Sequence, residues 1–251
     1  MIYYFIVIFY GLILGSFLSV IISRLDQKSG LWMGRSECPN CLTKLRWYDL
    51  FPILSFMFLK GKCRYCDNHI SWLYPIMELS VAGSFLLYYI FNGQSVGAEN
   101  LYWLFIIFVL LILFFFDYVH FILPDKLILT AFLATVLYNF AFNKNFSASG
   151  LFMGLALAGF FSIIFIVSKG EWMGLGDVKL AFLIGFIFGY PIAILSIITA
   201  TWLGALLGLG MMAVGRASLK TELPFGTFIS GAAIIFIIFN EVINRYVQYI
   251  F

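Results

Sequence analysis

The stretch FIIFVLLILFFFDYVHFILPDKL, residues 105–127, decides the class of fold. An unbroken apolar run ends in one acid, Asp117, and a second acid, Asp125, follows a proline. A helix needs about 20 apolar residues to cross the roughly 30 Å hydrocarbon core of a membrane, and the run approaches that length when it is read from Leu101. The stretch therefore predicts a membrane-spanning helix with a carboxyl group near one end.

Composition extends this prediction to the whole chain. Of its 251 residues, 63% are apolar and only 11% are charged. The mean hydropathy of +1.02 is well above that of soluble domains. We therefore predict an all-α polytopic membrane protein with about eight spans. The candidate apolar runs are residues 2–23, 73–91, 101–116, 127–142, 150–167, 178–189, 191–215 and 226–243.

The basic residues predict the orientation, because cytoplasmic loops of membrane proteins are enriched in Lys and Arg. With the amino terminus outside, thirteen of the fifteen basic residues fall on the cytoplasmic side, and only Lys144 and Arg245 fall outside. The net charge of +3 therefore reflects topology, and no nucleic-acid partner is expected. The first run lacks a preceding basic residue and a small-residue cleavage site, so we interpret it as a retained helix.

One long polar segment interrupts the apolar sequence, and it contains all four cysteines. It divides the chain into a first helix, a small cytoplasmic domain and a main membrane domain, at residues 1–23, 24–72 and 73–251. The cysteines form two pairs, CPNC and CRYC, with 21 residues between the pairs. They are Cys38, Cys41, Cys63 and Cys66. This spacing is typical of four thiolates around one zinc ion.

A site closed by four cysteines leaves no coordination position for a reacting water, so the predicted Zn2+ is structural. Disulfides and free thiols are the alternatives, and a reducing cytoplasm disfavours disulfides. His69, three residues after Cys66, is expected to be a surface residue and not a further ligand.

Two aspartates are the candidate catalytic groups. Asp117 ends the third apolar run, and Asp177, in MGLGD, opens the sixth run from the same side of the membrane. An acid at the edge of the hydrocarbon region is costly unless it is paired, hydrated or protonated, so such residues are usually functional. Gly174 and Gly176 remove side chains beside Asp177 and allow close approach of another chain segment. Two neighbouring carboxyls share one proton and can serve as general base and general acid in peptide hydrolysis.

Other roles remain open for these and nearby residues. Asp177 could simply cap a helix amino terminus, and Asp125 is the better capping candidate for the fourth helix. Glu78, in YPIMELS, could pair with a basic loop residue or serve a second site, and His120 is as consistent with an interfacial role as with a catalytic one. A proton- or ion-coupled transporter is the main alternative function, and an assembly scaffold is another. Transporters usually contain internal repeats, and we find none.

Several motifs in a fixed order resemble the type IV prepilin peptidases, a family of membrane aspartic proteases that are also N-methyltransferases. The resemblance runs nearly end to end. Its segments are GLILGSFLSVIISRL, CPNC, YDLFPILSFMFLKGKCRYC, ISWLYPIMEL, FFDYVHFILPDKLIL, MGLGDVKL and LPFGTFI.

The resemblance implies that Asp117 and Asp177 are the catalytic acids of an endopeptidase in the bacterial inner membrane. The expected partners are prepilins or pseudopilins, whose basic leader is removed after glycine at the cytoplasmic face. The new amino terminus would then be methylated with S-adenosylmethionine. By the same resemblance, methyl transfer falls to the amino-terminal part, including Glu78. The sequence contains no Rossmann fingerprint for that cofactor, and it leaves the oligomeric state open.

Overall fold

The computed structural model describes residues 2–25, 36–93, 97–142, 148–216, 218 and 221–250, with the backbone only at 247–250. Within these ranges the protein is helical, and its only β structure is two isolated bridges, Glu37–Lys44 and Lys62–His69. The prediction of an all-α fold is therefore confirmed. The chain forms two compact units, Met1–Gln94 and Ser95–Phe251, each described by itself below.

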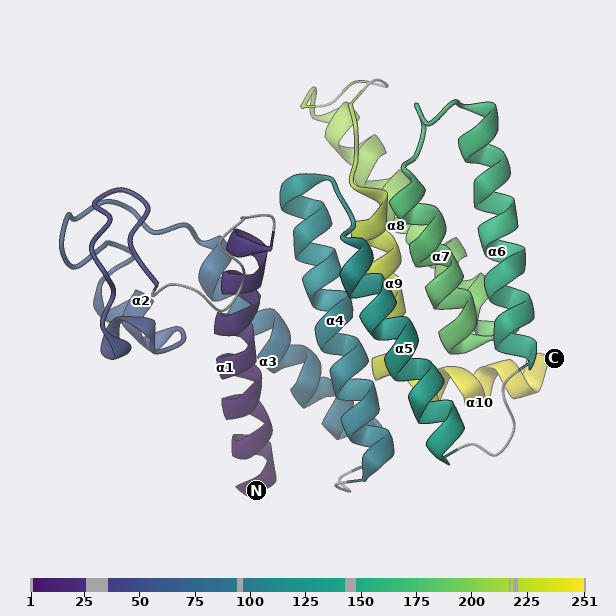
Figure 1. The fold of residues 1–251 in the computed structure, drawn as a ribbon, viewed down its shortest axis with the longest axis horizontal. Coiled ribbons are helices and arrows are strands. Elements are labelled where there is room, and N and C mark those ends of the chain that lie inside the picture. The colour runs from purple at the N-terminus through teal and green to yellow at the C-terminus, as the bar shows by residue number, and fades with distance from the viewer. Residues whose placement is uncertain are drawn as a thin grey trace. The chain divides into compact units, whose positions relative to one another are not determined.

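The first unit contains two long helices, α1 (Ile2–Arg24) and α3 (Leu73–Phe91), shown in Figure 1. A small domain between them holds a short 3-10 helix, η1 (Trp47–Leu50), and the five-residue α2 (Leu54–Phe58). Helices α1 and α3 pack together through the glycines of the GLILGS stretch. A Cβ atom on Gly15 would lie 2.5 Å from the Cα atom of Glu78, so only glycine permits this close approach.

The second unit contains the remaining seven described helices (Figure 1). They are α4 (Ala98–His120), α5 (Asp125–Phe142), α6 (Ala148–Val167), α7 (Leu175–Phe188), α8 (Ile192–Ala213), α9 (Phe225–Ile238) and α10 (Asn240–Ile250). Helix α4 packs against α5 and α9, and α7 packs against α6. The most deeply buried large side chains of α4 include Leu110, Leu113 and Phe116. Helix α4 is therefore central to the core of this unit.

Every predicted apolar run contains a helix, but not every helix is long enough to span a membrane alone. Six of the described helices have the length and hydropathy for a crossing, namely α1, α3, α4, α5, α6 and α8. The last predicted run, 226–243, is wrong as one continuous helix, because the chain bends by 82° between α9 and α10. Counting that bent pair as one span gives seven. Helix α7 has only 14 residues, which is short for a complete span.

Candidate functional site

Asp117 lies in the last turn of α4 and is only 5% exposed. Its Oδ2 atom accepts a hydrogen bond of 2.7 Å from the backbone N–H of Thr227, and the Thr227 hydroxyl oxygen lies 3.1 Å from the same atom. Thr227 is in the first turn of α9, where backbone N–H groups have no partner inside the helix. The carboxylate of Asp117 therefore caps the first turn of a helix through Thr227, which lies 110 residues further along the chain.

Asp177 occupies the first turn of α7 and is 8% exposed. Its Oδ2 atom accepts a hydrogen bond of 3.2 Å from the backbone N–H of Gly174, the residue before the helix. The alternative that Asp177 caps a helix is thus observed. Because this contact uses only Oδ2, capping does not prevent the other carboxyl oxygen from having a chemical role.

The side chain of Leu123 connects the surroundings of the two acids. A Cβ atom on Gly176, next to Asp177, would lie 2.9 Å from Leu123 Cβ. A Cβ atom on Gly226 would lie 2.7 Å from Leu123 Cδ1 and 3.0 Å from Asp117 Oδ2. Glycine at both positions therefore lets the ends of three segments meet around the two acids.

An ion pair lies at the same end of the unit. Lys179 Nζ, in α7, donates to both carboxylate oxygens of Asp125, at 2.6 and 2.8 Å. Asp125 is the first residue of α5, so it lies in the first turn of that helix, and its role as a helix cap stays a prediction. His120, the last residue of α4, has its ring 4.6 Å from that of Phe116. The starts of α5 and α7 are thus joined next to the two acids.

Sequence reasoning did not find Thr227, Lys179 or Leu123. The LPFGTFI motif contained a signal for Thr227, since Pro224 precedes a helix start and a hydroxyl follows three residues later. Neither Lys179 nor Leu123 has such a signal, because each is defined by a contact with a distant segment.

The second candidate site is in the first unit, where the four cysteines converge as predicted. The Sγ atoms of Cys38, Cys41, Cys63 and Cys66 all lie within 4.8 Å of one another, and the thiols are free. Four sulfurs around zinc at about 2.3 Å would be separated by about 3.8 Å, and the Cys38–Cys66 separation is 3.9 Å. A disulfide needs sulfurs only about 2.05 Å apart. The arrangement fits one tetrahedral metal ion, with His69 outside the cluster.

The backbone explains why the cysteines converge. In the first pair, the N–H of Cys38 donates to Thr43 O and the N–H of Leu42 donates to Cys38 O. In the second pair, Cys63 and Asp67 make the equivalent bonds, with Asn68 O as the first acceptor. Both pairs are therefore tight turns of the same form, which place two sulfurs each on one side.

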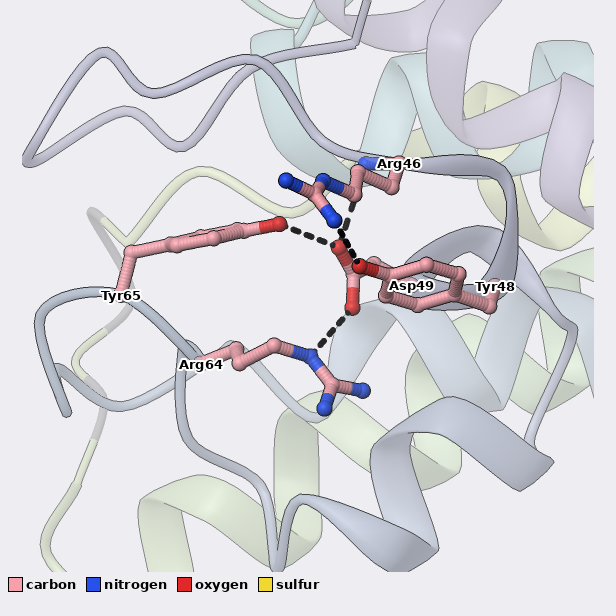
Figure 2. Close-up of polar contacts among 5 residues, drawn as sticks. All are labelled: Arg46, Tyr48, Asp49, Arg64 and Tyr65. Carbon is pink, nitrogen blue, oxygen red and sulfur yellow. Dashed lines mark hydrogen bonds and ion pairs between the residues drawn. The ribbon is translucent and has the colours of Figure 1, made fainter.

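A polar cluster joins η1 to the second cysteine turn (Figure 2). The carboxylate of Asp49 accepts hydrogen bonds from Arg64 Nε at 2.7 Å, the Tyr65 hydroxyl at 3.0 Å and the Arg46 backbone N–H at 3.1 Å. Arg46 in turn donates to the Tyr48 hydroxyl at 2.9 Å. Burial opposes ionisation of Asp49, but the hydrogen bonds, led by Arg64, hold its pKa below the usual value. The cluster therefore fixes η1 to the domain that carries the cysteines.

Glu78 is 8% exposed in α3, and it forms no ion pair within the described residues, which leave out the basic loop residues Lys28 and Arg35. Its Oε2 atom instead accepts a hydrogen bond of 2.7 Å from the backbone N–H of Ile53. Ile53 has φ of +60°, a conformation that is strained for a β-branched residue. Glu78 thus holds a strained turn of the small domain against α3.

Comparison with known proteins gives the family. The family model for the bacterial peptidase A24 N-terminal domain matches residues 9–91, and the type IV leader peptidase family matches residues 104–209. No solved structure matches the chain.

Three relatives carry the name prepilin leader peptidase/N-methyltransferase. The protein from Bacillus subtilis (strain 168) is 31% identical over 244 residues, with 97% of each chain covered. That from Stutzerimonas stutzeri is 29% identical over 270 residues, or 95% of this chain and 92% of the relative. That from Vibrio cholerae serotype O1 is 34% identical over 192 residues, or 71% and 75%. The transporter alternative finds no support among them, and the chain belongs to the type IV leader peptidase family.

Proposed function

We propose that this chain is an aspartic endopeptidase of the membrane that removes the basic leader of prepilins or pseudopilins and then methylates the new amino terminus. The observation that carries the proposal is the pair of buried acids, Asp117 and Asp177, held around Leu123 at one end of the second unit. The names of the relatives support both activities. The resemblance in sequence points to the same two acids, and their burial and hydrogen bonds support that assignment.

The proposed reaction is acid–base hydrolysis without a covalent intermediate. Two carboxyls in one buried site share one proton, because two negative charges there are costly. The ionised carboxylate takes a proton from water while the water oxygen attacks the carbonyl carbon of the scissile peptide bond. The protonated carboxyl then gives its proton to the departing amine as the C–N bond breaks.

The hydrogen bonds of the two acids fit this division of roles. Thr227 donates to Oδ2 of Asp117, and Gly174 donates to Oδ2 of Asp177. Among the described residues, no hydrogen-bond donor occupies Oδ1 of either acid. Each acid therefore has one oxygen that fixes the side chain and one oxygen available for water or substrate. Such fixed orientation is a large part of catalysis by positioned groups.

We also propose that the amino terminus lies outside and that the two acids face the cytoplasm. Basic residues near this end of the second unit support the orientation, including Lys126 beside Asp125 and Lys179 in α7. The leader of a prepilin, which is cytoplasmic, would then lie on the same side of the membrane as the two acids.

For the first unit we propose a structural Zn2+ held by the four cysteines, and methyl transfer from S-adenosylmethionine. The cofactor would supply the methyl group, and Glu78 remains the proposed residue for handling the substrate amine. The contact between Glu78 and Ile53 equally supports a structural role for Glu78. The two units match the two family models in turn, which supports separate places for the two activities.

The test is to incubate the purified full chain with a prepilin and S-adenosylmethionine and to weigh the products by mass spectrometry. We expect loss of the leader and a further gain of one methyl group on the shortened product. An intact precursor, in a preparation shown to be folded, contradicts the peptidase. A shortened but unmethylated product contradicts only the methyl transfer.

Gly226→Ala tests the geometry around Asp117. The new methyl group would lie 2.7 Å from Leu123 Cδ1 and 3.0 Å from Asp117 Oδ2, so the Leu123 side chain must shift and the carboxyl must move by a few tenths of an ångström. Displacing a catalytic group by about 1 Å costs on the order of 100-fold in rate, so we expect this smaller shift to lower cleavage several-fold. The matched control is Gly210→Ala in α8, where a Cβ atom meets nothing within 4 Å. Equal cleavage by both variants contradicts the proposed geometry.

A further inference from the structure

Exposed apolar side chains gather in one stretch of the small domain in the first unit, residues 47–58. The most exposed are Trp47 at 73%, Met57 at 67% and Phe58 at 82%. Leu50, Phe51 and Leu54 are exposed as well. Soluble domains rarely leave so many large apolar side chains together in water. We call residues 47–58 the apolar segment.

The contacts of the apolar segment place it beside a membrane helix and not beyond its end. Ile53 donates its backbone N–H to Glu78, the sixth residue of α3 and about 7.5 Å from the start of that helix. Phe56 packs against Trp72, which directly precedes α3, with 4.8 Å between the ring centroids. The segment therefore runs alongside the first turns of α3.

Helix α1 independently indicates how deep the contact between Ile53 and Glu78 lies in the membrane. Its Gly15 packs directly on Glu78. From Gly15, α1 continues for nine more residues, or about 13 Å, to its last residue, Arg24. A basic residue at the end of a spanning helix reaches the lipid headgroups. The Ile53–Glu78 contact thus lies on the membrane side of Arg24.

The charges at the end of the apolar segment are positive. Lys60 and Lys62 follow it after Leu59 and are exposed, and neither forms an ion pair within the described residues. The one acid inside the segment, Asp49, has a side chain only 2% exposed and is paired with Arg64. Apolar side chains flanked by free lysines match a leaflet with anionic headgroups. A basic peptide leader would instead be repelled.

We propose that residues 47–62 anchor the small domain to the membrane surface. The apolar side chains lie at the boundary between headgroups and acyl chains, and Lys60 and Lys62 contact anionic headgroups. Because Asp49 joins the segment to Arg64 and Tyr65 of the second cysteine turn (Figure 2), the anchor also sets the height of the cysteine cluster above the bilayer. This anchor requires only that α1 and α3 span a membrane, and it does not depend on the proposed function.

The test measures the depth of a spin label on the full chain in phosphatidylcholine vesicles, with and without phosphatidylglycerol. A keto amino acid at position 58 carries a ketoxime-linked nitroxide, which leaves the cysteines untouched. The same label at Asn40, an exposed polar residue between Cys38 and Cys41, is the matched control. At each position the measured quantity is the ratio of label collisions with oxygen to label collisions with a water-soluble nickel chelate. We expect this ratio to be several-fold higher at position 58 than at position 40.

Phosphatidylglycerol separates the contribution of the lysines. We expect phosphatidylglycerol to raise the ratio of oxygen to nickel-chelate collisions at position 58 when Lys60 and Lys62 are present. In the double variant Lys60→Gln/Lys62→Gln, we expect the lipid to leave that ratio unchanged. Equal collision ratios at positions 58 and 40 overturn the proposal. A label at position 58 that neither oxygen nor the nickel chelate reaches also overturns it, because the side chain would then be packed against protein. An apolar pilin helix peptide that shields position 58 from oxygen would make the surface a protein-binding site and also overturn it.

Discussion

Asp117→Asn and Asp177→Asn should each abolish leader cleavage while the protein stays folded and inserted. Asparagine has the size of aspartate, and its amide oxygen can still accept the hydrogen bonds from Thr227 and Gly174. It cannot take or give a proton in the reaction. Loss of one acid–base group costs up to about 10⁴-fold, and we expect at least about 10³-fold for each variant. The measurement is the rate of appearance of the shortened pilin.

Asp125→Asn is the matched control, because Asp125 lies in the same end of the unit and in the same sequence motif. Its partner is Lys179, and the side chains of the pair are 70% and 48% exposed, so the pair is worth little in stability. We expect nearly wild-type cleavage. Similar losses in all three variants would mean that any acid at this end of the unit matters, and the assignment of the pair would be wrong.

A second assay separates the two activities. A pilin peptide that already begins with the mature residue needs no cleavage, so Asp117→Asn should still methylate it. Loss of methylation together with cleavage would contradict separate places for the two reactions. It would leave the role of the two acids in cleavage intact.

The sequence predicted the helices well where apolar composition alone decides. Lipid exposure requires a long apolar run, and each such run contains a helix. The break between Ile238 and Asn240 was missed, because Ile243 lies a few residues further on and kept the run apolar on average. The polar residues Asn240, Glu241, Asn244 and Arg245 mark a helix with one wet face. Their spacing was the available signal for an interfacial helix.

For the sites, the sequence predicted groups that share a residue type and missed groups defined by a contact. Four cysteines in two Cys-x-x-Cys pairs predict a metal-binding cluster from residue type and spacing alone. The partner of Asp117 is the N–H of Thr227, and the partner of Glu78 is the N–H of Ile53. A backbone donor belongs to every residue except proline, so the sequence could mark the helix start after Pro224 but not the acid that its N–H groups would meet. Only the packing of distant segments selects these two.

Cys38→Ser together with Cys41→Ser should empty the metal site and unfold the small domain. We expect the wild-type chain to carry about one zinc ion, because the sulfur separations fit one tetrahedral site. The free energy of zinc binding in such sites is also folding free energy, so the domain cannot keep its structure on two thiolates. The measurements are metal per chain by mass spectrometry and hydrogen exchange across residues 36–72.

Asn40→Ser, in the same turn but not a ligand, is the control and should keep both the metal and the protection from exchange. Because Asp117 and Asp177 belong to the other unit, the double cysteine variant should still cleave a prepilin at a measurable rate. A wild-type chain that carries no metal and yet shows full protection from hydrogen exchange across residues 36–72 would contradict the zinc site. A double variant that keeps its metal would show that the four sulfurs do not act as one ligand set.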